Sequence, residues 1–207
     1  MLLETLLLLA ALAAALALQP WRMLRGGALG GPLLATLVLL PWLWALPALH
    51  AMPLQLQWSG ACLVLLMLGW PLAVPVFAAV AALAWAFAPS MAAGDALGLA
   101  GWQGIAPATL ALGLGWLVRR FVGAHLFVYV LGRAFLGTVV CVFIAGALSQ
   151  FAGHALPRID GGLSLVGRWL MAWGDGIVTG MLVAVFVAFR PAWLATWSDR
   201  LYLPPPG

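Results

Sequence analysis

The sequence predicts an all-α protein, a bundle of transmembrane helices, and two observations support this. Of its 207 residues, 66% are hydrophobic and only 7% are charged, whereas a soluble domain has about 25% charged residues. The apolar residues also lie in long runs that end at Pro and Gly clusters rather than at charges. A soluble fold needs a polar exterior rich in charged side chains, so we expect lipid to surround most of the chain.

A helix needs about 20 apolar residues to cross a bilayer, and on this basis the chain divides into seven predicted spans. They cover residues 2–18, 33–49, 58–70, 72–87, 105–118, 126–150 and 163–189. The apolar stretch 60–87 is too long for one straight span, and its Gly69-Trp70-Pro71 break favours two connected helices. One kinked span is the alternative. We expect residues 1–190 to form a single transmembrane domain, followed by a short cytoplasmic tail at 191–207.

Arginine placement predicts how the bundle is oriented. With seven spans and the N-terminus outside, six of the nine basic residues, all of them Arg, fall on the cytoplasmic side: Arg22, Arg25, Arg119, Arg120, Arg190 and Arg200. Cytoplasmic loops are enriched in basic residues, so we expect an outer N-terminus and a cytoplasmic C-terminus. A six-span model breaks this grouping. The Arg residues are dispersed rather than forming a stripe, which argues against a nucleic-acid partner.

Three ionisable residues lie within predicted spans, where charged groups are costly and often functional. Glu4 lies within a turn of the outer surface, so hydration there competes with a functional role. Arg133 is near enough to the cytoplasmic face for its long side chain to reach water. Asp175, between Gly174 and Gly176, is too short to do so and needs a partner. Arg133 is one candidate, through an extended arm or a water, and substrate handling is the other reading of this pair.

Histidines supply the candidate metal ligands, because neutral imidazole commonly binds transition metals. The predicted topology places His50 and His154 outside, together with Asp95, and it places His125 inside. We therefore take His50, His154 and Asp95 as candidate ligands for an incoming ion, with simple solvation of a loop histidine as the alternative. No His-x-His or Cys-x-x-Cys spacing accompanies them.

Other chemistry finds little support in the sequence. Cys62 and Cys141 sit in apolar runs that suit packing, and they offer neither a metal spacing nor a disulfide framework. The glycines at 101–115 precede no Lys, and the chain contains no Lys at all, so a phosphate-binding loop is not predicted. No set of nucleophile, base and orienting group appears. We expect neither an enzyme nor a covalently bound cofactor.

Three stretches carry a resemblance to a known family. They are DGIVTGMLVAVFVAFRPAWLATWSDRLYL at 175–203, SGACLVLLMLGWPLA at 59–73 and HLFVYVLGRAF at 125–135. In this order they resemble parts of the permease family of energy-coupling factor transporters, the CbiM type associated with cobalt and nickel uptake, and especially its shorter proteobacterial branch. The resemblance covers about a third of the chain.

The resemblance implies a seven-helix substrate-binding subunit in the bacterial inner membrane. Its cargo would be a divalent transition metal, or a small metal-bearing molecule, and its partners would be a second membrane protein and cytoplasmic ATPases. The family's metal-binding members begin with Met followed by His, whereas this chain begins Met1-Leu2. A non-transporting structural or assembly subunit of a larger membrane complex is the alternative function.

Overall fold

The computed structural model describes residues 2–49, 57–154 and 161–203, and every regular element within these ranges is helical. The first half contains α1 (Leu2–Ala17), the 3-10 helix η1 (Pro20–Gly26), α2 (Gly30–Leu49), α3 (Ala61–Leu68) and α4 (Trp70–Phe87). Then α5 (Ala93–Gly98), the π-helical η2 (Leu99–Ile105) and α6 (Ala106–Phe121) follow without a break. The rest comprises π-helical η3 (Val128–Leu136), α7 (Gly137–Phe151), α8 (Gly161–Phe189), η4 (Pro191–Trp193) and α9 (Asp199–Tyr202).

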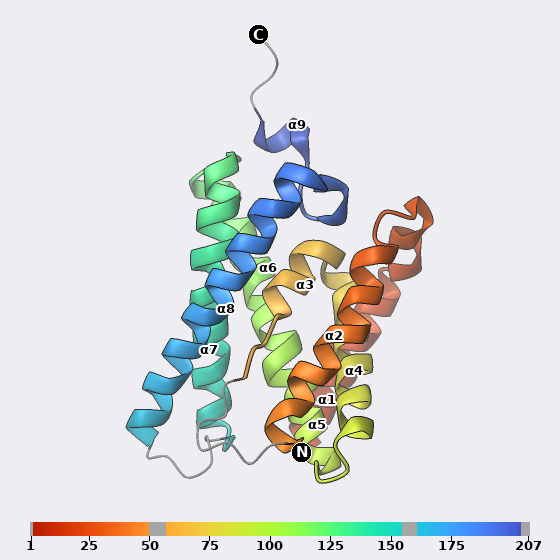
Figure 1. The fold of residues 1–207 in the computed structure, drawn as a ribbon, viewed down its shortest axis with the longest axis vertical. Coiled ribbons are helices and arrows are strands. Elements are labelled where there is room, and N and C mark those ends of the chain that lie inside the picture. Colours follow the sequence, from red (N-terminus) through yellow and green to blue (C-terminus); the bar gives the residue numbers. More distant parts are fainter. Residues whose placement is uncertain (1, 50–56, 155–160, 204–207) are drawn as a thin grey trace.

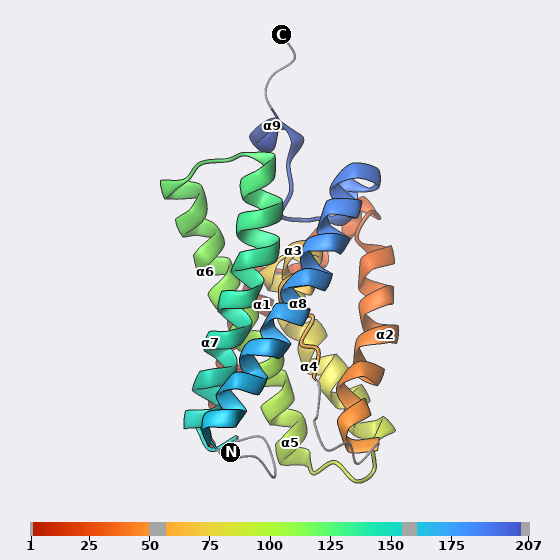
Figure 2. The same ribbon diagram turned by 60° about the vertical axis from the view of Figure 1, so that its left-hand side comes forward.

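The long helices stand side by side as one bundle, with α1 beginning at one end and α9 lying at the other (Figures 1 and 2). Within the described residues, five helices are long and apolar enough to cross a membrane, and α1 with η1, bent by 49°, makes a sixth. Their length and composition indicate a membrane protein. The predicted helical bundle is therefore confirmed, with five or six membrane-length helices; seven spans and the direction of insertion remain predictions.

The two ends of the bundle differ in charge. One end carries η1 with Arg22 and Arg25, the last turn of α6 with Arg119 and Arg120, and the segment after α8; we call it the basic end (top of Figure 1). The opposite end carries the start of α1, α5 and the beginning of α8. The arginines predicted to share one side of the membrane thus lie in segments at one end of the molecule.

The third predicted span, 58–70, is wrong as a continuous helix. Residues 57–60 form no regular element, and α3 has only eight residues. Gly60 (φ 64°) precedes this helix and Gly69 (φ 73°) follows it, and both adopt left-handed backbone conformations that favour glycine. All eight residues of α3 are buried. The predicted break at Gly69 is confirmed. The helix before this break, however, is a short and fully buried one rather than a membrane span.

The fifth predicted span also differs from the structure. It was expected at 105–118, yet the helix extends from Ala93 to Phe121, a length of 29 residues. Gly104 is needed for close packing, since a Cβ there would lie 2.8 Å from Phe77 Cγ. Gly104 therefore allows α4 and η2 to approach without ending the helix.

The chain after α8 folds back onto α3. The backbone N–H groups of Ala195 and Thr196 donate to the carbonyl oxygens of Met67 (3.0 Å) and Leu66 (3.3 Å) at the C-terminal end of α3. The Thr196 hydroxyl adds a bond to the Leu66 oxygen at 3.0 Å. These bonds satisfy carbonyls that a helix end leaves unpaired. The start of the predicted cytoplasmic tail is thus packed against the bundle, while residues 204–207 lie outside the described ranges.

Close contact between α7 and α8 depends on glycine. A Cβ at Gly176 would lie 2.5 Å from Val139 Cγ2 and 3.0 Å from the backbone oxygen of Phe135. Helices in membranes commonly use small residues to approach this closely. Gly176 therefore lets α8 lie close to the continuous helix formed by η3 and α7.

We predict that Gly176→Ala destabilises the protein by about 1–3 kcal/mol, because the added methyl group overlaps atoms of η3 and α7 that have little room to move. Gly174→Ala is the matched control on the same helix, since nothing lies within 4 Å of its Cβ position. It should leave stability unchanged or raise it by up to about 1 kcal/mol. Unfolding in detergent measures both, and equal effects of the two variants would contradict this packing.

Candidate functional site

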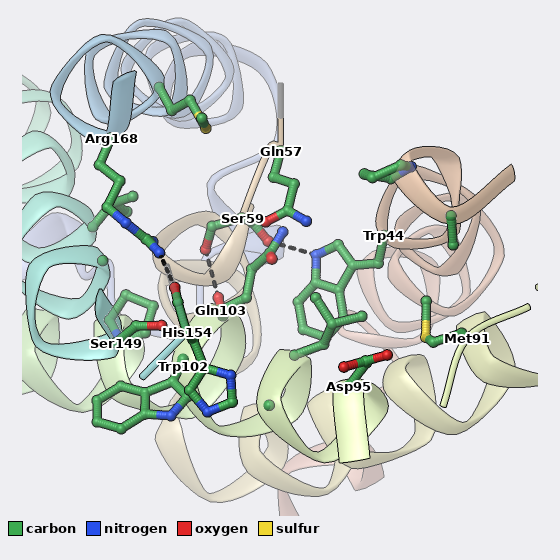
Figure 3. Close-up of a pocket in the computed structure, with 18 of the residues that line it drawn as sticks. Trp44, Gln57, Ser59, Met91, Asp95, Trp102, Gln103, Ser149, His154 and Arg168 are labelled. Carbon is green, nitrogen blue, oxygen red and sulfur yellow. Dashed lines mark hydrogen bonds between the residues drawn. The ribbon is translucent and has the colours of Figure 1, made fainter. Parts of the chain in front are cut away.

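A cavity of about 650 Å³ opens at the end of the bundle opposite the basic end. Its walls come from the C-terminal part of α2, residues 57–59, the turn before α5, η2, the end of α7 and the first half of α8. Its volume lies in the range of small-molecule sites. Many of its lining groups are polar: Gln57, Ser59, Ser90, Asp95, Gln103, Ser149, His154 and Arg168. Figure 3 shows these side chains converging from several helices.

The floor of the cavity is a hydrogen-bonded crossing of three segments. Trp44 Nε1 donates to the carbonyl oxygen of Ser59 at 3.1 Å. The Ser59 hydroxyl donates to the backbone oxygen of Gln103 at 2.6 Å, and Gln103 Nε2 donates to the oxygen of Trp58 at 3.2 Å. The extended segment before α3 is therefore held by both α2 and η2 (Figure 3). These bonds leave the Gln103 side-chain oxygen free of a protein donor in the described structure.

Asp175 fixes the same segment from α8. Its carboxylate accepts hydrogen bonds from the backbone N–H groups of Ser59 (2.8 Å) and Gly60 (3.2 Å), and the residue is 1% exposed. Carboxylates are favourable at the N-terminal end of a helix, where N–H groups lack partners. Asp175 therefore anchors the two residues that lead into α3, although it lies more than 100 positions away in the sequence. The Ser59 hydroxyl in turn accepts a hydrogen bond from the N–H of Ala61, the first residue of α3, at 3.2 Å.

Glu4 and His154 meet at one side of the cavity. The Glu4 carboxylate contacts His154 Nε2 and accepts a bond from Trp102 Nε1 at 3.0 Å. The Glu4 side chain is only 12% exposed, compared with 38% for that of His154. The indole and the imidazole rings lie 6.4 Å apart. Glu4 was predicted to be either hydrated or functional, and the structure places it in a network that joins α1 to the cavity wall.

Arg168 reaches into the cavity from α8, and Figure 3 shows its guanidinium directed at His154. Its NH2 group donates to the backbone oxygen of His154 at 2.5 Å. Its buried Nε has no hydrogen-bond partner, and it forms no ion pair within the described part of the chain. A Cβ at Gly146 would lie 3.3 Å from its NH1 atom, so a glycine gives this side chain room. The cavity thus contains a cation whose charge no protein carboxylate balances among the described residues.

The candidate metal ligands are partly brought together. His154 and Asp95 both line the cavity, and Asp95 also accepts a bond from the backbone N–H of Ala92 at 3.2 Å. In Figure 3 they stand apart along the cavity wall. Within the described residues, no three His, Cys, Asp or Glu side chains are grouped closely enough to hold a metal ion. His50 lies outside the described residues.

The proposed pairing of Arg133 with Asp175 is wrong for the described structure. Arg133, in η3, is 8% exposed, and its guanidinium carbon lies 5.7 Å above the centre of the Tyr129 ring. Its Nε has no hydrogen-bond partner and packs over Gly115, where a Cβ would lie at 2.6 Å. Arg133 was expected to extend toward water, but the ring and the glycine hold it inside the bundle. It does not line the cavity.

Sequence reasoning missed Arg168, Ser59 and Gln103 as site residues. Arg168 carried a usable signal, because it is a basic residue on the side of the membrane where basic residues are scarce. Gln103 lies between Trp102 and Gly104 in a π-helical stretch, a feature frequent at functional sites, but this becomes visible only in the structure. Ser59 carries no such signal. Its role follows from a backbone crossing that local sequence does not encode.

Comparison with protein-family models, with curated proteins and with solved structures gave no match to this chain. The resemblance to energy-coupling factor permeases therefore remains a prediction from the sequence.

We predict that Asp175→Asn lowers stability by about 2–4 kcal/mol. The amide keeps the size of the side chain but has one acceptor oxygen, so a buried N–H of Ser59 or Gly60 loses its partner and the charge-assisted bonding is lost. Asp95→Asn is the control, because Asp95 is exposed and an amide oxygen can still accept the N–H of Ala92. Its effect should stay below about 0.5 kcal/mol. Equal losses of stability in the two variants, measured by unfolding in detergent, would contradict the anchoring role of Asp175.

Proposed function

We propose that this chain is the substrate-binding membrane component of an energy-coupled uptake system in a bacterial inner membrane. The observation that carries the proposal is the polar cavity at one end of an otherwise apolar bundle. Burying polar groups in a membrane is costly, so a purely structural bundle has no need for amides, hydroxyls and an Arg around an open space of about 650 Å³.

Among the described residues, bonded and buried groups lie on the side of the cavity toward the basic end. Ser59 and Gln103 form the cavity floor, and the eight buried residues of α3 follow Ser59 and Gly60 in the chain toward that end (Figure 1). Passage of a bound solute would therefore require this floor to move. This favours a carrier-type component over a channel.

Energy for that motion would come from other subunits. The chain has no Lys, so it lacks the lysine with which phosphate-binding loops hold ATP. We propose cytoplasmic ATPase subunits and a second membrane protein as partners, in keeping with the resemblance to energy-coupling factor permeases. The basic end, with Arg119 and Arg120 in the last turn of α6, would face the cytoplasm and those partners.

The proposed cargo is a divalent transition metal, as the resemblance implies, carried within a small molecule. His154 and Asp95 offer nitrogen and oxygen donors on the cavity wall. The cavity, however, has the size of a small-molecule site rather than of an ion cage. A metal that keeps part of its coordination shell on an organic ligand fits both features.

We predict that filling the cavity stops uptake. Ala48→Trp places an indole at the cavity wall and should lower metal accumulation, measured by elemental analysis of cells, at least tenfold relative to wild type in a deletion strain. Ala82→Trp is the control, because Ala82 is an exposed position on α4. It should restore wild-type accumulation.

Equal accumulation in the deletion strain with and without the wild-type gene would contradict the transport proposal. Identification of the chains that copurify in mild detergent distinguishes the alternative. An ATPase among them supports transport, whereas an unrelated membrane complex, with no change in metal content, supports the structural or assembly role.

A further inference from the structure

We infer that the cavity binds a small organic molecule bearing a carboxylate, and that Arg168 is the residue that receives it. This inference rests on the proposed function and names the class of its cargo. It starts from the one cationic side chain that lines the cavity within the described residues.

The geometry of Arg168 leaves it able to accept an anion. One NH2 group is bound to the His154 backbone oxygen at 2.5 Å, which fixes the direction of the guanidinium. Among the described residues no hydrogen bond engages NH1, which passes over Gly146, whereas the buried Nε is enclosed by protein. A guanidinium has five N–H donors in a planar fork that matches the two oxygens of a carboxylate. Donors of this fork therefore remain for a ligand.

The carboxylates near the cavity also leave Arg168 available to an anionic ligand. Glu4 is engaged by His154 and Trp102. Asp95 lies on the other side of the cavity from Arg168 in Figure 3 and caps the start of its own helix through Ala92. The cation is therefore not neutralised by either carboxylate. A partly buried guanidinium that no carboxylate among the described residues neutralises attracts an anion and repels a bare divalent cation.

The rest of the lining suits a polar organic body. The side chains of Gln57, Gln103 and Ser149 supply amide and hydroxyl groups to the same cavity (Figure 3), and the methionines Met91 and Met171 supply apolar surface. A few placed polar groups and one charge in a cavity of this size are typical of sites for small molecules. The carboxylate can belong to a free organic acid or to the organic ligand of a bound metal, and Arg168 recognises the same group in both.

The test uses the purified full-length chain in detergent, with binding measured by calorimetry. The probes are citrate, L-histidine, the nickel complex of each, and Ni²⁺ alone. We expect at least one carboxylate probe to bind wild type and to bind Arg168→Gln at least tenfold more weakly. Arg168→Lys keeps the charge without the fork, so it should recover part of the affinity. Arg120→Gln, on the basic end, should bind as wild type does.

The outcomes separate the sources of the carboxylate. Binding of the metal-free probes identifies an organic acid, and binding only of the nickel complexes identifies a metal chelate; both support the inference. Failure of every carboxylate probe to bind wild type overturns it. So does equal binding by wild type and Arg168→Gln, or tight binding of Ni²⁺ alone that Arg168→Gln leaves unchanged or strengthens. Thermal unfolding of each variant in detergent confirms that the protein compared is folded.

The binding test and the uptake test can fail independently of each other. Carboxylate binding that depends on Arg168, without any uptake defect in the deletion strain, would remove the transport proposal and leave the inference in place. If uptake depends on the wild-type gene but continues at the wild-type rate with Arg168→Gln, the transport proposal stands and the inference about Arg168 falls.

Discussion

The carboxylate of Asp175 determines how the middle of this protein is built. A chain that leaves α2 and returns through an apolar bundle must find partners for its backbone N–H groups, because lipid and apolar side chains provide none. Asp175 supplies them from α8, by accepting the N–H groups of Ser59 and Gly60 at 2.8 and 3.2 Å. An extended segment and an eight-residue helix can therefore lie inside the bundle, at the place where a full membrane span was expected.

The cavity follows from this arrangement. Because Asp175 holds the backbone of Ser59, the serine hydroxyl and carbonyl face η2 and α2 and complete the floor with Gln103 and Trp44. The other end of α3 is held by the segment after α8, through bonds from Ala195 and Thr196. Both ends of the short helix thus depend on contacts with α8 or with the chain that follows it. Motion of α8 relative to α2 would act on the floor of the cavity directly.

Hydropathy predicted much of this structure, and the reasons for its failures are physical. The helices at 33–49, 72–87, 126–150 and 163–189 were placed within a few residues, because long apolar runs admit little besides helix in a membrane. The break at Gly69 was also predictable, since the following Pro71 cannot donate a backbone hydrogen bond. The third span was wrong because its apolar residues are buried against protein rather than lipid, and composition does not distinguish the two environments.

The site was only partly predictable. Asp175 was singled out by its cost in a membrane, but its partners are backbone groups more than 100 residues away, which no sequence pattern marks. Glu4, Asp95 and His154 were assigned to one side of the membrane, and the structure places them around one cavity. Arg168 was not among the predicted site residues. The structure shows that its side chain enters the cavity and forms no ion pair with a described carboxylate.

Labelling of the two cysteines tests the role of Asp175 most directly. Cys62 lies in the first turn of α3 and Cys141 lies in α7, and they are 1% and 2% exposed. In Asp175→Ala we expect a maleimide to modify Cys62 at least ten times faster than in wild type, because the segment that leads into α3 loses its anchor, while Cys141 keeps its wild-type rate. Mass spectrometry of the two peptides resolves the rates. Continued protection of Cys62, or equal acceleration at both cysteines, would contradict the account.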